Sequence, residues 1–112
     1  MPHSRAAMVC AGLLIIAWTV PAVAATPEFE LLIRGKRFEP SVIEIPAGQK
    51  VKLIVRNLDA TPEEFESYEL RREKIIPGNS EAIIYVGPLK PGEYPFFGEF
   101  NPDTAQGRLI AN

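Results

Sequence analysis

The sequence predicts an all-β fold, a Greek-key β-sandwich or barrel that forms a single domain. Short apolar runs recur at regular intervals, and turns rich in Pro and Gly separate them. No longer segment combines helical apolar periodicity with capping residues. Several short strands joined by such turns are typical of sandwiches and Greek-key barrels.

Six strands are expected, and each has its own signal. The run 50–56, KVKLIVR, alternates polar and apolar residues as a half-buried strand does. Turns follow from Pro46 and Gly48, from Gly87 and Pro88, and from Pro91 and Gly92. Residues 65–72 are the one place where a short helix or irregular segment is expected. The six strands are 29–33, 42–45, 50–56, 82–86, 94–97 and 107–111.

Residues 1–25 are expected to be a secretory signal peptide, followed by the domain 26–112. Arg5 supplies the positive start, residues 11–20 form a short apolar stretch, and Ala22-Val23-Ala24 is a small-x-small cleavage site. The apolar stretch is shorter than the roughly 20 residues that a membrane span needs. We therefore expect an exported, periplasmic protein whose mature chain has no membrane span.

Cleavage would remove several kinds of reactive side chain. The single His, Cys and Trp and both Met residues all lie within the first 25 residues. The remaining domain could form no disulfide, could use no thiol or imidazole as nucleophile or base, and could build no zinc site of the nitrogen and sulfur type. All 14 acidic residues remain, and the acidic balance argues against a nucleic-acid partner.

The segment PEEFESYE, residues 62–69, interleaves four glutamates with a Phe and a Tyr. On an extended chain Glu64 and Glu66 point to the same side and Phe65 to the other, and we expect Phe65 to face the core. Two such carboxylates can converge on one hard cation, such as iron, Mn²⁺, Mg²⁺ or Ca²⁺. An ordinary charged surface, with Arg71, Arg72 and Lys74 as ion-pair partners, is the alternative.

Three local patterns resemble the cupredoxin family, and the resemblance extends over essentially the whole domain. They are FEPSVIEIPAGQKV at 38–51, Asn57-x-Asp59 followed by Pro62, and LKPGEYPFFGEFNPDTAQGRLI at 89–110. The resemblance implies a cupredoxin-like Greek-key fold. Asn57 and Asp59 are expected to stabilise a turn rather than to bind metal.

The copper ligands of that family are replaced in this chain. By the resemblance, Glu63 stands at the position of the first histidine, Gly98 at that of the cysteine and Ala105 near that of the methionine. Asn101 stands where relatives often have histidine. Type-1 copper needs imidazoles and a thiolate, so we expect none here.

The motif Glu64-Phe65-Glu66 resembles the cupredoxin-like domains of bacterial ferrous-iron uptake systems, of the EfeO and FtrB types. The resemblance implies a periplasmic protein that binds iron or copper through carboxylates and serves an inner-membrane permease together with other periplasmic components. It also raises a ferroxidase role, in which Fe²⁺ is oxidised before transport. The candidate metal ligands are Glu64, Glu66, Glu99 and Asp103, with Glu63 and Glu69 as secondary candidates.

Two other functions are compatible with the same residues. The domain could be a metal-free cupredoxin-fold module that docks a protein partner, or a structural domain stabilised by calcium. These three functions differ in whether metal ions change the stability of the domain, and in which metal ion does so.

Overall fold

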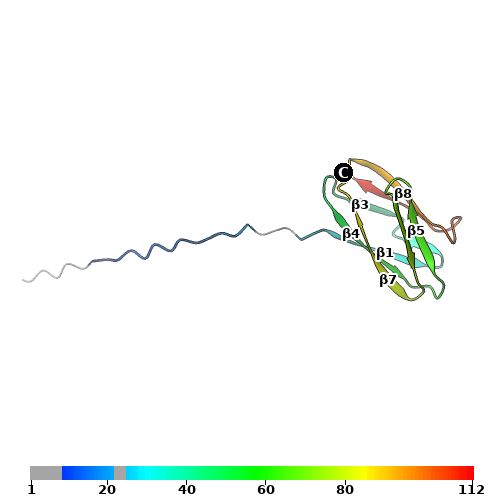
Figure 1. The fold of residues 1–112 in the computed structure, drawn as a ribbon, viewed down its shortest axis with the longest axis horizontal. Helices are drawn as coiled ribbons and strands as arrows, with labels where there is room; N and C mark the ends of the chain where they lie inside the picture. The colour runs from blue at the N-terminus through cyan, green and yellow to red at the C-terminus, as the bar shows by residue number, and fades with distance from the viewer. Residues whose placement is uncertain (1–8, 22–24) are drawn as a thin grey trace, which may run out of the picture.

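The computed structural model describes residues 9–21 and 25–112. The described part contains nine β-strands and no helix, as expected for an all-β chain (Figure 1). The strands are β1 (Glu28–Arg34), β2 (Arg37–Glu39), β3 (Val42–Ile45), β4 (Val51–Asn57), β5 (Glu63–Ser67), β6 (Arg72–Ile76), β7 (Ser80–Val86), β8 (Gly92–Gly98) and β9 (Gln106–Ala111). All six predicted strands are present, and β2, β5 and β6 are additional.

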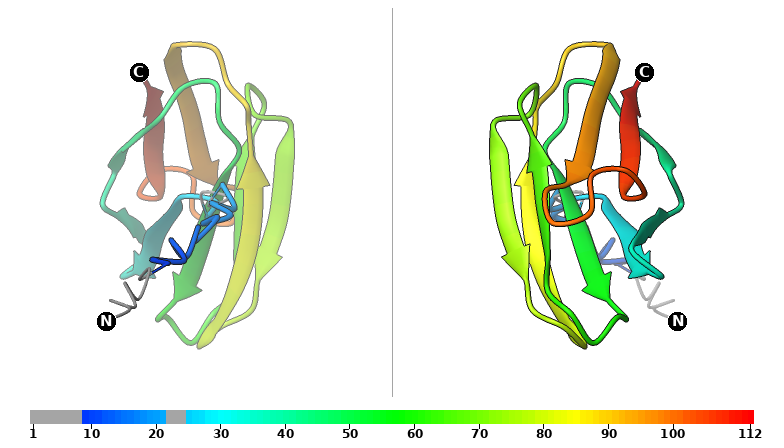
Figure 2. Two further views of the ribbon diagram at one scale, coloured as in Figure 1. Left: turned by 90° about the vertical axis from the view of Figure 1, so that its left-hand side faces the viewer. Right: turned by 90° about the vertical axis from the view of Figure 1, so that its right-hand side faces the viewer.

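Two sheets pack face to face into a sandwich (Figure 2). One has the strand order β2-β1-β4-β7 and the other the order β3-β9-β8-β5-β6. The pairs β1–β4 and β3–β9 are parallel, and the remaining pairs are antiparallel. Strand β5 therefore lies between β8 and β6, which brings the PEEFESYE segment beside the C-terminal hairpin.

The core lies between the sheets and follows from alternation along each strand. In β4, Val51, Leu53 and Val55 are fully buried, as the period-two pattern predicted. Phe65 and Phe96 stack with ring centroids 5.0 Å apart at the centre of the core. The prediction that Phe65 turns inward is confirmed, since none of its surface is exposed.

The expectation of a short helix or irregular segment at 65–72 was wrong for residues 65–67 and for Arg72, which belong to strands, whereas residues 68–71 form an irregular turn. Strand β5 continues to Ser67, a turn occupies residues 68–71, and β6 begins at Arg72. Four of the five residues of β6 are exposed because it is the edge strand of its sheet. Because so little of β6 is buried, its sequence does not alternate between polar and apolar residues, and the strand could not be predicted from that pattern.

The turn after β4 is stabilised as predicted by Asn57 and Asp59. The Asn57 amide nitrogen donates to the carbonyls of Thr61 and Ile76, and its oxygen accepts from the backbone N–H of Asp59. The Asp59 carboxylate accepts from the N–H groups of Gly35 and Lys36, both at 2.8 Å. These side chains hold three loops together at the end of the sandwich.

The proposed signal peptide is only partly within the described chain. Residues 9–21 are exposed and form neither helix nor strand, while the predicted cleavage site at Ala22–Ala24 lies outside the described residues. Among the residues that the structure describes, no helix has the length and apolar character needed to cross a membrane.

Candidate metal centre

Strand β5 presents different carboxylates on its two faces. Glu63, Phe65 and Ser67 are buried between the sheets, while Glu64 and Glu66 lie on the outer face of the five-stranded sheet. Side chains alternate across a strand, so this division follows directly from the extended conformation. The prediction that Glu64 and Glu66 share one face is confirmed by the position of their carboxylates.

Glu73 completes a cluster of three carboxylates on this outer face. Strand β6 pairs with β5 so that Glu73 lies directly opposite Glu66. One carboxylate oxygen from each of Glu64, Glu66 and Glu73 lies within 4.8 Å of the others. We call these three residues the carboxylate cluster. Glu64 is 7% exposed, Glu66 is half-buried and Glu73 is exposed, so the cluster is open to solvent on one side.

The sequence analysis did not identify Glu73. Its proximity depends on the antiparallel register of a hairpin whose second strand was not predicted. A turn over residues 68–71 places Ser67 opposite Arg72 and therefore Glu66 opposite Glu73. A hairpin assigned to this segment would have revealed the pair from spacing alone.

Within the described residues, no ion pair neutralises the cluster. The five ion pairs of this part of the chain involve other carboxylates. The guanidinium of Arg72 donates instead to the backbone carbonyls of Leu70, Arg71 and Tyr85. Arg71 and Arg72 do line an open hollow of about 300 Å³ beside Glu66 and Glu73, without an ion pair there. This argues against an ordinary ion-paired surface.

Crowding of the carboxylates changes their proton affinity. The pKa of Glu64 is raised from its ordinary value of 4.5 to about 7. A hydrogen bond shared with the Glu73 carboxyl contributes most, followed by burial and by repulsion from Glu73, Glu66 and Glu99. The pKa of Glu66 is also raised, by burial first and then by repulsion from Glu73 and Glu99.

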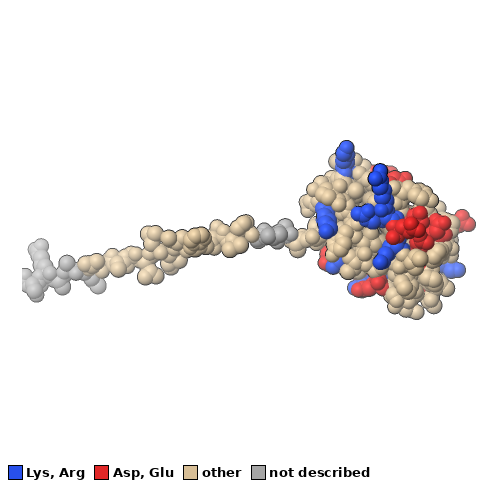
Figure 3. Space-filling model, in the orientation of Figure 1, with Lys and Arg blue, Asp and Glu red and all other residues tan. Residues whose placement is uncertain are grey.

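A cation would relieve this repulsion. Three converging carboxylates supply only oxygen donors, which suit hard cations such as iron, Mn²⁺, Mg²⁺ and Ca²⁺. Figure 3 shows acidic side chains gathered where Figure 1 labels β5, with basic side chains nearby. The outer face of β5 is thus chemically suited to a cation.

The other predicted ligands lie at different distances from the cluster. Glu99 follows β8, and its backbone N–H donates to the carbonyl of Glu64 at 2.9 Å. Its charge acts on both Glu64 and Glu66, so it belongs to the same electrostatic neighbourhood. Asp103 is exposed in the loop between β8 and β9, and Glu69 is exposed in the 68–71 turn. Neither is among the three converging carboxylates.

Glu63 lies on the inner face, where the resemblance located the copper ligands. A Cβ atom on Gly98 would lie 2.6 Å from both the Glu63 Cδ and the Ala105 Cβ, so these three positions do converge. Asn101 joins them through a hydrogen bond of 2.6 Å to Glu63. The four residues provide neither thiolate nor imidazole, and the Glu63 carboxylate fills the space. They do not fit type-1 copper.

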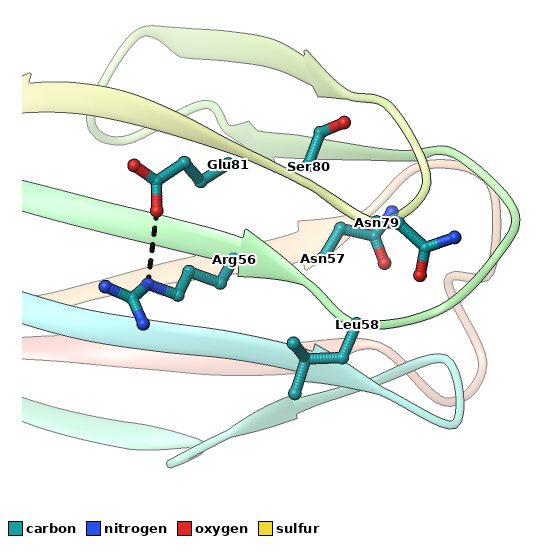
Figure 4. A pocket seen from close by; sticks show the side chains of 6 residues that line it. All are labelled: Arg56, Asn57, Leu58, Asn79, Ser80 and Glu81. Atoms are coloured by element: carbon teal, nitrogen blue, oxygen red, sulfur yellow. Dashed lines mark ion pairs between the residues drawn. The ribbon is translucent and has the colours of Figure 1, made fainter.

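A second hollow, of about 390 Å³, lies at the end of β4 and β7 (Figure 4). Its walls include Asn57, whose amide is fully hydrogen-bonded, and Arg56, which pairs with Glu81 at 3.2 Å. Ser80 donates to the carbonyl of Gly78, and the side chain of Asn79 is exposed at the edge of the hollow.

Comparison with known proteins places this geometry in context. Residues 6–111 match the family described as cupredoxin-like domain. An uncharacterised protein of Rickettsia prowazekii is 46% identical over 85 residues, which cover 76% of this chain and 68% of that protein. The iron uptake system component EfeO of Yersinia pseudotuberculosis is 32% identical over 96 residues, which cover 80% of this chain. This match spans a quarter of EfeO, 25% of its length.

Solved structures agree on the fold. Auracyanin A, a blue copper protein of Chloroflexus aurantiacus, superposes with a TM-score of 0.67 at 14% identity, covering 79% of this chain and all of that one. The metal-binding domain of the Cu(I)-exporting ATPase CopA of Streptococcus pneumoniae gives a TM-score of 0.67 at 15% identity, covering 76% of this chain and 84% of that domain. At these identities the likeness concerns the fold alone.

Proposed function

This chain belongs to the family of cupredoxin-like domains, and from that premise we propose that it is an extracytoplasmic metal-binding protein of an iron uptake system. Its cargo is an iron ion held by the carboxylate cluster, with copper as the alternative metal. The similarity to EfeO supports the iron context, and the oxygen-only donor set supports a hard cation over a soft one. In this role the protein would pass its cargo to an inner-membrane permease, together with other periplasmic components.

One observation carries the proposal. Three carboxylates converge on the outer face of one hairpin, and no ion pair neutralises them in the described part of the chain. Such an arrangement opposes its own ionisation, and a bound cation removes that opposition. Glu64 is the central member because it is the most buried of the three.

Thermal unfolding of the domain with and without Mn²⁺, Cu²⁺ and Ca²⁺ tests the proposal, with Mn²⁺ as an air-stable substitute for Fe²⁺. A ligand that binds only the folded state stabilises it by about 2.7 kcal/mol at 100 times its dissociation constant. We expect Mn²⁺ to raise the melting midpoint by several degrees, as this energy implies for a small domain. The triple variant Glu64→Gln/Glu66→Gln/Glu73→Gln should lose that increase.

Two controls locate the site. Glu44→Gln removes an exposed carboxylate from β3, outside the cluster, and should leave the Mn²⁺ response intact. Glu69→Gln/Asp103→Asn tests the two predicted ligands that the fold leaves outside the cluster, and should reduce the response little. A response to Ca²⁺ alone would favour a structural calcium site, and no response to any metal would refute the proposal.

A ferroxidase role extends the same proposal. Carboxylates favour Fe³⁺ over Fe²⁺ because Fe³⁺ is the harder ion, so the cluster would ease loss of one electron from bound Fe²⁺. The electron would have to pass to a redox centre in a partner protein or to another acceptor, since the domain itself carries no thiol or imidazole copper site. Oxidation of Fe²⁺ without air, with and without an added acceptor, measures this step.

A metal-free docking role is the second candidate, and one observation favours it. Tyr68 is 70% exposed, and its ring lies 5.5 Å from that of Phe97, beside the cluster. Exposed aromatic pairs are common in protein interfaces. If Mn²⁺ leaves the melting midpoint unchanged and Tyr68→Ala abolishes binding to a periplasmic partner, docking is the function.

A further inference from the structure

The inner face of β5 contains a buried carboxylate whose hydrogen-bond donors are all uncharged groups. Glu63 is 1% exposed. Its Oε1 accepts from the backbone N–H groups of Phe100, at 2.9 Å, and Glu64, at 3.0 Å. Its Oε2 accepts from the side-chain amide of Asn101 at 2.6 Å. Three donors thus compensate one buried charge, which otherwise would be costly to bury.

The neighbouring residues are small where the carboxylate needs space. A Cβ atom at Gly98 would lie 2.6 Å from the Cδ of Glu63 and 2.6 Å from the Cβ of Ala105. The φ of Gly98 is not in the left-handed region, so the reason for glycine here is space rather than backbone conformation. Glu63 and any larger side chain at position 98 exclude each other.

The same hydrogen bonds fix the loop that follows β8, coloured orange in Figure 2. Phe100 and Asn101 are both tied to Glu63, and Glu99 immediately precedes them. The N–H of Glu99 donates to the backbone carbonyl of Glu64 at 2.9 Å. Glu99 is therefore held between a bond to the backbone of β5 and the bonds that its two neighbours make to the Glu63 carboxylate.

We propose that Glu63, Gly98 and Asn101 form a latch that replaces the metal ion of copper-binding relatives and positions Glu99 as a fourth carboxylate beside the carboxylate cluster. In this arrangement the inner position is closed to metals, and the metal-binding function lies on the opposite face of the same strand. Glu63 is then a positioning residue and not a ligand. The second part of this inference rests on the proposed function, whereas the latch itself does not.

Mn²⁺ affinity in a double-mutant cycle tests the positioning role. Glu63→Leu removes the acceptors and should weaken Mn²⁺ binding about tenfold or more, as loss of groups that orient ligands does. Glu63→Gln keeps an oxygen for the Phe100 N–H and should restore most of the affinity. In a Glu99→Gln background, Glu63→Leu should cause no further loss, because both changes act through Glu99.

The positioning role would be overturned if Glu63→Leu bound Mn²⁺ as tightly as the unmodified protein. It would also be overturned if the losses of Mn²⁺ affinity in Glu63→Leu and Glu99→Gln added fully in the double variant. If Glu63→Leu does not fold, Asn101→Ala takes its place. Asn101 is only half-buried, and its removal deletes one of the three donors. It should lower Mn²⁺ affinity several-fold, and again not in the Glu99→Gln background.

Stability without metal tests the latch separately from metal binding. In the unmodified chain, Asn101→Ala should lower the melting midpoint. In a Glu63→Gln background, the same substitution should change the midpoint hardly at all, because the hydrogen bond between the Asn101 amide and the Glu63 carboxylate has been lost already. Gly98→Ala should lower it through contact with Glu63 and Ala105. Equal effects of Asn101→Ala in both backgrounds, or an unchanged midpoint in Gly98→Ala, would refute the latch. If the unmodified protein binds no Mn²⁺ but these shifts occur, the proposed function fails and the latch stands.

Discussion

Glu64 combines two properties that each oppose ionisation of its carboxyl group. It is almost fully buried, although its side chain is on the outer face of its sheet, and it has two other glutamates of the cluster beside it. Burial and repulsion both favour the neutral form, and a hydrogen bond with Glu73 uses the added proton. Without a cation, Glu64 therefore keeps its proton between pH 4.5 and about pH 7, where the raised pKa makes it differ from an ordinary glutamate.

The raised pKa of Glu64 makes stability depend on pH. Between its ordinary value of 4.5 and its folded value of about 7, the folded protein binds more protons at this site than the unfolded chain does. The free energy of unfolding therefore falls as pH rises through this window. We expect the melting midpoint of the metal-free domain to fall from pH 4.5 to pH 7, and the slope to be smaller in Glu64→Gln.

The comparison between variants isolates this residue. Glu44→Gln, at an exposed position of β3, should keep the slope of the unmodified protein. Saturating Mn²⁺ should reverse the trend, because the cation binds the ionised form. Identical slopes in Glu64→Gln and the unmodified protein would contradict the assignment of the proton to Glu64.

Alternation along one strand was enough to place Glu64 and Glu66 together. It could not include Glu73, whose distance from Glu66 is set by the turn at 68–71 and by hydrogen bonds between two strands. Glu63 shows the same limit, since the replacement of histidine was visible but its hydrogen bonds to Phe100 and Asn101 were not. Contacts between side chains distant in the sequence are set by the fold, so a local sequence pattern does not predict them.

At the scale of elements, the side chains on the two faces of β5 have different roles. Its inner residues complete the core and tie down the loop after β8, while its outer residues form the cluster. Strand β6 contributes Glu73 from an exposed edge. The ends of β4 and β6 are joined by Asn57, whose amide donates to the carbonyl of Ile76.

Asn57 should therefore contribute far more to stability than its exposed neighbour Arg56. Asn57→Leu leaves two carbonyls and the N–H of Asp59 without their partner, and we expect a loss of about 2–4 kcal/mol in the free energy of unfolding. Arg56→Gln breaks exposed ion pairs and should cost less than about 1 kcal/mol. Denaturant titration measures both, and equal losses would contradict the role given to Asn57.

At the scale of the whole molecule, the two sheets have different outer faces. In the described part, four of the five ion pairs join residues of the four-stranded sheet, and only Arg108–Glu93 lies on the other. The four-stranded sheet balances its own charges, whereas the five-stranded sheet carries the cluster without such balance. This asymmetry supports the outer face of the five-stranded sheet as the side of the proposed cation site.

The domain is expected to fold without the proposed signal peptide. Residues 9–21 are exposed and belong to no strand, so a chain beginning at residue 26 keeps all nine strands. Its denaturant midpoint should equal that of the longer chain. Removal of residues 1–31 is the matched control: it deletes four of the seven residues of β1, which pairs with both β2 and β4, and should abolish cooperative unfolding. A lower midpoint for the chain beginning at residue 26 would show that the leader contributes to the fold.

The sequence by itself determined the fold class, six of the nine strands, the inward turn of Phe65 and the shared face of Glu64 and Glu66, because all of these follow from local periodicity and turn chemistry. It also determined which donors are absent at the position of the copper ligands. Only the tertiary structure decided that Glu73 joins the cluster, that Asp103 and Glu69 lie outside it, and that Glu63 is bound by the loop after β8. These depend on strand register and on contacts between distant segments, which no local pattern encodes.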